Sequence, residues 1–300
     1  MYESYYGFKE KPFSLLPDPG FIFPSKKHRL AQSMLEYGLL NQAGFTVITG
    51  EIGSGKTTLV RQLLAQVALD QDITIGLVSN THRSFGELMQ WVLLAFKLDY
   101  RNKDKVEMYQ VFSEFMRREY DLGHRTVLII DEAQNLSIEA MEELRMLSNI
   151  NADKDQFLQL ILIGQPGLKD MLRRPELEQF AQRIAIDYHL QTLELQETCE
   201  YIRHRLVVAG GDPNLFEAAA CVAVHFYTRG TPRLINVLCD TALVCAFAEQ
   251  RPRVDADLIH DVVRDKHVGG ILPVSELDEV ANDVVLDMHA AKKKSQHSSD

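Results

Sequence analysis

The chain has 300 residues, enough for one large domain or for a large domain with a small one. Hydrophobic residues make up 46% and charged residues 25%, as in a globular protein with a substantial core. The formal net charge of -10 argues against non-specific nucleic-acid binding by the whole surface. It does not exclude a local basic stripe in an oligomer. The N-terminus has no apolar signal core and no segment reaches the roughly 18 apolar residues of a membrane span, so we expect a cytoplasmic protein.

Residues 1–24 are rich in aromatic residues and proline, a composition that flexible linkers lack. They predict an ordered, extended arm. Ser25 is the predicted N-cap of a helix that runs to about Gln42. The apolar positions that fall close to helical spacing in this segment are Leu30, Met34, Tyr37 and Leu40.

Short apolar runs then alternate with helical patterns as far as residue 190. The predicted strands are 45–49, 73–79, 126–130, 157–163 and 184–190. The predicted helices are 56–68, 85–96, 106–120 and a segment that Ser137 caps and that runs through Leu147. Continuously apolar strands separated by helices indicate a parallel sheet covered on both faces, and therefore an α/β fold.

No strand is predicted after residue 190. Helices are expected at 196–209, 215–227, 232–248 and 256–266, which form a small all-helical lid domain. The predicted organisation is an arm (1–24), an α/β core (25–193), a helical lid domain (194–267) and a tail (268–300). In the tail, residues 278–288 can form a short amphipathic helix, and the polar end is expected to be disordered.

The segment Gly50–Thr57 (GEIGSGKT) fits the phosphate-loop pattern G-x-x-x-x-G-K-[ST], between a predicted strand and a predicted helix. Glycines let successive backbone N–H groups point at phosphate oxygens, and the helix N-terminus favours an anion. Lys56 reaches the β- and γ-phosphates of ATP, and the Thr57 hydroxyl ligates Mg²⁺. The residues assigned to nucleotide binding are Gly50, Glu51, Ile52, Gly53, Ser54, Gly55, Lys56, Thr57 and Thr58.

Two carboxylates, Asp131 and Glu132, follow the apolar run Val127–Ile130. A buried strand of this kind delivers its C-terminal end beside the phosphate loop. We expect Asp131 to hold Mg²⁺, directly or through water, and Glu132 to orient and polarise the attacking water. The alternative is an acidic helix N-cap. Glu132 is the reason to favour hydrolysis over simple binding.

Two further polar residues are candidate sensors of the γ-phosphate. Gln165 follows an apolar strand and can sense the phosphate or help to hold the water, or it is a turn residue before Pro166. Arg233 lies in a first helical turn, with Thr231 as the expected N-cap and Pro232 as the first helical residue. An arginine there opposes the helix dipole, so that an anion such as the γ-phosphate is its expected partner. The alternatives are a surface arginine or an internal ion pair.

An arginine that completes a neighbouring subunit's site is expected before the last strand. Arg183 is the first candidate, and Arg173 and Arg174 lie about ten residues earlier. Each of the three can equally be an ordinary arginine of the surface or the core edge.

Together these features resemble an AAA+ ATPase with the P-loop NTPase αβα sandwich, and most closely the secretion-type ATPases labelled ExeA or GspA. The resemblance covers about residues 1–267. Its motifs are Tyr6–Phe13, Pro17–Pro19, Gly44–Thr58, Asp131–Gln134, Leu144–Asn149, Gly164–Pro166 and Gly230–Arg233. Within that family, Ser79–Gly86 and Asn149–Asp155 are similar to the stand-alone ATPase that accompanies exosortase (PEP-CTERM) exopolysaccharide systems.

The resemblance implies ATP and Mg²⁺ as cofactors and assigns roles to the motif positions. Walker A is Gly50–Thr57 and Walker B is Asp131 with Glu132, while sensor 1 is Gln165 and sensor 2 is Arg233. The resemblance also implies a trans-acting arginine near Arg183, and it places the arm in the adenine pocket, through residues around Pro12 and Phe13. The aromatic residues of the arm can equally serve packing alone.

The sequence departs from the family at two points. Sensor 1 is Gln rather than the commoner Asn, Ser or Thr, which leaves its role less defined. The secretion relatives often continue into a membrane span and a periplasmic peptidoglycan-binding part, and this sequence contains neither, so that direct cell-wall remodelling is not expected.

Three functions are compatible with these sequence features. The first is an ATP-hydrolysing assembly ATPase, a homo-oligomer that serves a protein partner in envelope secretion or exopolysaccharide export, peripheral to the inner membrane through partners. The second is a nucleotide-dependent switch or scaffold that turns over slowly. The third is a DNA-associated regulator like the transposition ATPases, against which the acidic balance counts.

Overall fold

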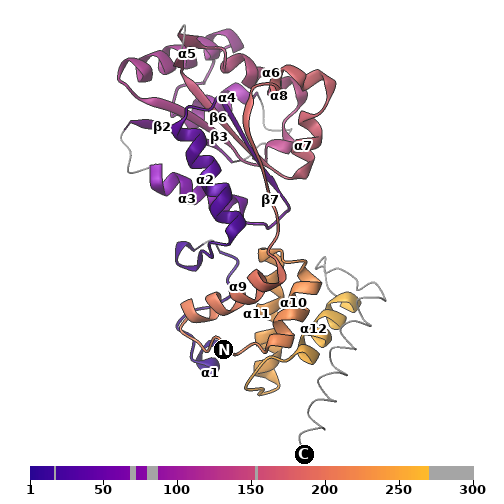
Figure 1. The fold of residues 1–300 in the computed structure, drawn as a ribbon. Helices are drawn as coiled ribbons and strands as arrows, with labels where there is room; N and C mark the ends of the chain where they lie inside the picture. The colour runs from indigo at the N-terminus through magenta and orange to yellow at the C-terminus, as the bar shows by residue number, and fades with distance from the viewer. Residues whose placement is uncertain (17, 68–71, 80–86, 153–154, 270–300) are drawn as a thin grey trace, which may run out of the picture. The chain divides into compact units, whose positions relative to one another are not determined.

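The computed structural model describes residues 1–16, 18–67, 72–79, 87–152 and 155–269. Most of the motif segment Ser79–Gly86, the candidate helix at 278–288 and nearly all of the tail lie outside the described residues. The chain forms two compact units (Figure 1). One is Lys26–Gln191, and the other combines Met1–Ser25 with the chain from Thr192 onward.

The first unit is built on a parallel sheet of five strands in the order β2-β3-β6-β1-β7 (Figure 1). The strands are β1 (Phe45–Gly50), β2 (Ile73–Val78), β3 (Arg125–Ile130), β6 (Leu158–Gly164) and β7 (Ile184–Leu190). The predicted parallel sheet is therefore confirmed, and each strand begins and ends within one residue of its predicted bounds. A short antiparallel hairpin, which the sequence did not predict, joins β4 (Asn151–Ala152) to β5 (Asp155–Gln156).

Both faces of the sheet are buried, which explains why its strands are continuously apolar. In β3, Val127 and Ile129 belong to the cluster formed with α2 and α3, whereas Leu128 and Ile130 belong to the cluster formed with the helices of the other face. All four are fully buried. Each such side chain contributes about 1.5–3 kcal/mol on burial, so the strand is held from both sides.

One face is covered by α2 (Lys26–Leu40) and α3 (Lys56–Val67). The other face is covered by α4 (Leu88–Ala95), α5 (Lys105–Asp121), α6 (Ile138–Leu147), α7 (Pro166–Leu172) and α8 (Glu178–Ala181), with the 3-10 turns η2 (Ala133–Asn135) and η3 (Pro175–Leu177). Ser137 caps α6 as expected, because its side chain accepts a hydrogen bond from the N–H of Ala140. The short elements α7 and α8 were not predicted, since two turns or fewer carry too little periodicity.

Helix α2 buries a different face from the one that the predicted apolar positions mark. The exposed fractions are 47% for Leu30, 60% for Tyr37 and 75% for Leu40. The buried face consists of Ala31, Leu35, Gly38 and Leu39. Gly38 lets this face lie close to the sheet, because a Cβ on Gly38 would lie 2.7 Å from Thr46 Oγ1.

The second unit contains α9 (Leu195–Val208), α10 (Ala218–Thr228), α11 (Pro232–Ala248) and α12 (Ala256–Gly269). These are the four predicted helices, and their buried residues share one core. The helix expected from residue 215 begins later, at Ala218. The reason is that Phe216 forms a parallel bridge with Val254, which draws the preceding residues out of helical geometry.

The N-terminal arm was expected to be extended, but parts of it are helical. It begins with the helix α1 (Tyr2–Tyr6), which ends at Gly7 in the left-handed region (φ 73°), and it contains the 3-10 turn η1 (Pro19–Phe21). Four aromatic residues of the arm enter the core of the helical unit: Tyr2, Phe8, Phe13 and Phe21. The aromatic residues therefore act as packing groups within that unit.

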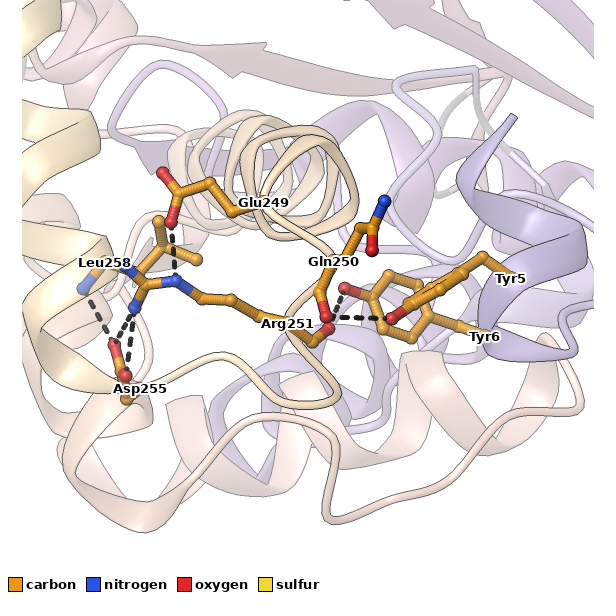
Figure 2. Close-up of polar contacts among 7 residues, drawn as sticks. All are labelled: Tyr5, Tyr6, Glu249, Gln250, Arg251, Asp255 and Leu258. Atoms are coloured by element: carbon orange, nitrogen blue, oxygen red, sulfur yellow. Dashed lines mark hydrogen bonds and ion pairs between the residues drawn. The ribbon is translucent and has the colours of Figure 1, made fainter.

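Polar contacts fasten the arm at two places within the same unit. The buried guanidinium of Arg205 donates to the carbonyls of Pro12 (2.5 Å) and Ser14 (3.1 Å) and lies 4.5 Å from the ring centroid of Phe21. Figure 2 shows the second place, where the hydroxyls of Tyr5 and Tyr6 donate to the carbonyls of the turn between α11 and α12. No helix in the described part of the chain is long and apolar enough to span a bilayer.

Candidate active site

The predicted phosphate loop connects β1 to α3 at the carboxyl edge of the sheet. Gly53 (φ 79°) and Gly55 (φ 103°) adopt backbone conformations that side chains disfavour. Space also requires glycine at two positions. A Cβ on Gly50 would lie 2.7 Å from the carbonyl oxygen of Leu190, and a Cβ on Gly55 would lie 2.6 Å from His28 Nε2. The loop is therefore a tightly built turn that depends on glycine at these positions.

Lys56 places its ammonium inside this loop. Its Nζ donates to the carbonyl oxygens of Gly50 (2.8 Å) and Glu51 (2.9 Å), and the residue is only 6% exposed. Burial lowers the pKa of Lys56, although Glu132, Asp131 and Glu51 act in the opposite direction. An ammonium has three N–H donors, so the loop carbonyls occupy two of them. A buried cation held in this way is well suited to neutralise phosphate charge.

His28, on the first turn of α2, supports the loop from the side and was missed in the sequence. Its Nε2 lies 2.9 Å from the carbonyl oxygen of Ser54. Because a carbonyl only accepts, Nε2 must carry the proton and donate. No motif marks a histidine 26 residues before its partner, so only the tertiary structure could reveal it.

The strand register brings the acidic pair to the same edge. β6 lies between β1 and β3, where Thr49 pairs with Gly164 and Ile130 pairs with Leu162. Asp131 follows directly, and its Oδ2 lies 3.5 Å from the hydroxyl of Thr57. Burial raises the pKa of Asp131, against the hydrogen bond from the N–H of Glu132.

Glu132 turns back toward the end of β6. Its backbone is in the left-handed region (φ 55°), and its Oε2 accepts hydrogen bonds from the side-chain amides of Gln134 (2.6 Å) and Gln165 (3.0 Å). The candidate sensor Gln165 thus lies beside the candidate catalytic carboxylate. Gln134, which the sequence analysis named only as part of a motif, forms hydrogen bonds with both residues.

The residues at this edge fit a nucleotide with Mg²⁺. The side-chain oxygen of Ser54 is buried inside the loop with no hydrogen-bond partner among the described protein atoms. The carboxylate of Asp131 and the hydroxyl of Thr57 are the hard oxygen ligands that Mg²⁺ prefers, and they lie next to each other. The carboxyl edge of a parallel sheet is also where ligands bind in open α/β folds.

Other candidate residues lie away from this cluster in the structure. Arg183 donates to Ser148 Oγ (2.8 Å) and the carbonyl of Arg145 (3.4 Å) in its own chain. Arg173 is largely exposed and forms a 4.0 Å ion pair with Asp170. Arg174 precedes η3. A role in a neighbouring subunit's site stays a prediction for all three.

Arg233 and Phe13 belong to the helical unit. Arg233 lies in the first turn of α11, after Thr231 at the N-cap and Pro232 at the first helical position, as expected, although the Thr231 side chain makes no capping hydrogen bond. Phe13 is 1% exposed and packs edge-on against Phe216, with ring centroids 5.7 Å apart. Contact of either residue with a nucleotide stays a prediction.

Known structures share this fold. The chain superposes on the ORC2 protein of Aeropyrum pernix, solved as ADPNP–ADP complexes, with a TM-score of 0.64 and 17% identity over 88% of this chain and 74% of that one. Cdc6p of Pyrobaculum aerophilum gives a TM-score of 0.64 with 12% identity, over 85% of this chain and 70% of that one. At such identities the likeness concerns the fold alone.

Sequence comparison identifies the family of the chain. A family model described as an AAA domain matches residues 40–172. The chain is 39% identical over 249 residues to the general secretion pathway protein A of Aeromonas hydrophila, which covers 83% of this chain. It spans 45% of that relative's length. The chain therefore belongs to the AAA+ ATPase family of the ExeA/GspA type.

Proposed function

We propose that the protein binds and hydrolyses ATP with Mg²⁺. The observation that carries this proposal is the meeting of Lys56, Thr57, Asp131 and Glu132 at the carboxyl ends of β1 and β3. Family membership supports nucleotide binding by this site. Hydrolysis of the bound nucleotide goes beyond this support and is our proposal.

In this proposal each residue has a distinct part. The N–H groups of the loop and the ammonium of Lys56 bind the phosphate oxygens, while Thr57 and Asp131 would hold the metal ion. Mg²⁺, when bound, neutralises charge on the phosphates. Glu132 orients the attacking water and accepts its proton, and Gln165 fixes the carboxylate of Glu132 through the 3.0 Å hydrogen bond.

The test is phosphate release by the purified chain with ATP and Mg²⁺. Glu132→Gln keeps the size of the side chain but removes its basicity, so that we expect ATP affinity to persist and turnover to fall at least about 100-fold. Lys56→Ala is expected to lose ATP binding, and chelation of the metal to stop turnover. Unchanged turnover in Glu132→Gln would refute the hydrolytic role and leave the slow nucleotide-dependent switch.

We further propose that ATP turnover drives assembly or remodelling of a protein complex in envelope secretion or exopolysaccharide export. The relative's name supports secretion. The narrower exopolysaccharide assignment rests on the resemblance of the sequence to the exosortase-associated ATPase. The protein would act in the cytoplasm as a homo-oligomer, peripheral to the inner membrane through its partners, with the helical unit as the lid that carries Arg233 to the nucleotide.

This cellular role is tested by deleting the gene and measuring extracellular polysaccharide. We expect a loss that the wild-type chain restores and that Lys56→Ala does not. Export that continues unchanged after deletion would refute the exopolysaccharide assignment without affecting the biochemical proposal.

A further inference from the structure

The side-chain amide of Gln134 bridges the ends of β3 and β6. Its Nε2 donates to Glu132 Oε2 at 2.6 Å, and its Oε1 accepts from the backbone N–H of Gln165 at 2.9 Å. A backbone N–H only donates, so the atom that faces it must be the amide oxygen. The NH₂ group must then face the carboxylate, which fixes the orientation of the amide without arbitrary choice.

The end of β6 leaves room for this amide. Gly164 carries no side chain, and a Cβ there would lie 2.7 Å from Gln134 Oε1 and 2.9 Å from Leu168 Cδ2. Neither neighbour is free to retreat, because the oxygen is bonded to Gln165 and Leu168 is fully buried. The bridge therefore depends on glycine at the last position of the strand.

Glu132 needs such a support. Its left-handed backbone conformation is uncommon for a residue with a side chain. The N–H of Glu132 donates to Asp131 Oδ1 at 2.9 Å, which leaves the side chain to be oriented by its own contacts. Two amide donors, from Gln134 and Gln165, meet on the same oxygen, Oε2.

We propose that Gln134 is a positioning residue for ATP hydrolysis. It holds the Glu132 carboxylate in the orientation that serves the attacking water, and it ties this orientation to the end of β6. A catalytic group must be held within a fraction of an ångström, and a hydrogen-bonded neighbour is the usual way to achieve this. The inference rests on the proposed role of Glu132.

The experiment is a double-mutant cycle on ATP turnover. Gln134→Leu has a similar volume and removes both hydrogen bonds, so we expect kcat to fall on the order of 10- to 100-fold. KM for ATP should stay within about twofold, because Gln134 makes no contact with the phosphate loop among the hydrogen bonds of the described residues. In a Glu132→Gln background the same substitution should change kcat by less than about twofold, since the group on which it acts is already lost.

Two further variants keep the test decisive. Gln110→Leu removes a similar 2.9 Å amide–carboxylate hydrogen bond, to Glu114 on the exposed side of α5, and should leave kcat unchanged. Gln134→Glu keeps an acceptor for the N–H of Gln165 but places a second carboxylate beside Glu132. If Gln134→Leu does not fold, Gln134→Glu takes its place in the test. The kcat of Gln134→Glu should also fall.

Each outcome has one meaning. Wild-type kcat in the Gln134 variants, with Glu132→Gln impaired, overturns the inference and leaves the proposed function standing. Losses that multiply independently in the double variant also overturn it, because they indicate a structural role. Wild-type kcat in Glu132→Gln refutes the proposed function itself, and the inference fails with it.

Discussion

At the scale of single residues, the site holds two buried charged groups whose burial lowers the stability of the fold. Burial raises the pKa of Asp131 and lowers that of Lys56, so each is disfavoured in its charged form. Such groups lower stability and are retained where binding or catalysis requires them. The two charges lie at the edge of the sheet that carries the phosphate loop, and this agrees with the function proposed for it.

The raised pKa of Asp131 predicts a gain in stability from Asp131→Asn. The folded protein binds this proton more tightly than the unfolded chain does, so ionised Asp131 lowers stability at pH 7. We expect the variant to have a higher Tm at pH 7 without nucleotide. The gain should shrink as the pH falls through the raised pKa toward the ordinary value of 3.8, because the carboxyl group is then protonated in both states.

Thermal unfolding at pH 7 and at a pH below 3.8 measures this effect. The matched control is Asp170→Asn, since Asp170 is largely exposed. The Asp131 variant should lose ATP turnover as it gains stability. A lower Tm at pH 7 would contradict the argument from burial.

His28 gives a second prediction at this scale. The hydrogen bond from its Nε2 to the carbonyl of Ser54 fixes the shape of the phosphate loop. A net hydrogen bond contributes about 1 kcal/mol, which corresponds to about fivefold in affinity. We expect His28→Ala to weaken ATP binding by this factor in a fluorescent-nucleotide titration. His124→Ala is the control, because His124, in the turn between α5 and β3, pairs with Glu119 of α5. Equal affinity in wild type and His28→Ala would refute the supporting role.

At the scale of elements, the N-terminal arm behaves as part of the helical unit. Its four buried aromatic residues complete a core that the helices α9 to α12 would otherwise leave open. Arg205 links α9 to the arm through two carbonyl groups and the ring of Phe21. Tyr5 and Tyr6 secure the other side, at the turn before α12 (Figure 2).

Arg205→Met should therefore destabilise the helical unit strongly. The substitution keeps most of the apolar stem but leaves the carbonyls of Pro12, which is buried, and Ser14, which is half-buried, without their donor, at a cost of about 3 kcal/mol. Chemical denaturation followed by circular dichroism measures the change. Arg203→Met on the same helix is the control, since Arg203 is exposed. Similar midpoints for the two variants would mean that the arm is held by apolar packing alone.

At the scale of the whole molecule, the open question is whether one chain completes the site of another. Arg183 is engaged within its own chain by Ser148, so its proposed role in trans requires that this contact be exchanged or shared. A mixing experiment addresses this directly. Chains with Lys56→Ala lack a working phosphate loop, and chains with Arg183→Ala lack the arginine.

We expect each variant to be inactive alone and the mixture to recover part of the ATP turnover, because an Arg183 from one chain can serve the intact loop of the other. Ser148→Ala is the control: it removes the contacts of this hydroxyl with Arg183 and with the carbonyl of Arg145, both within the chain, and should keep turnover. No recovery at any mixing ratio would exclude Arg183 as a trans arginine. The same design with Arg173→Ala or Arg174→Ala would then test the other candidates.

The parallel sheet, the phosphate loop and the acidic pair could all be predicted from the order of the residues. These features are local: a buried strand is continuously apolar, and the loop and the carboxylates follow directly in the chain. Tertiary structure alone decided that His28 supports the loop, that Gln134 joins Glu132 to Gln165, and that Phe13 packs in the helical core. It also decided that α2 buries Leu35 and Leu39 rather than Leu30, Tyr37 and Leu40. The physical reason is that each of these depends on segments that are distant along the chain and meet only when the chain folds.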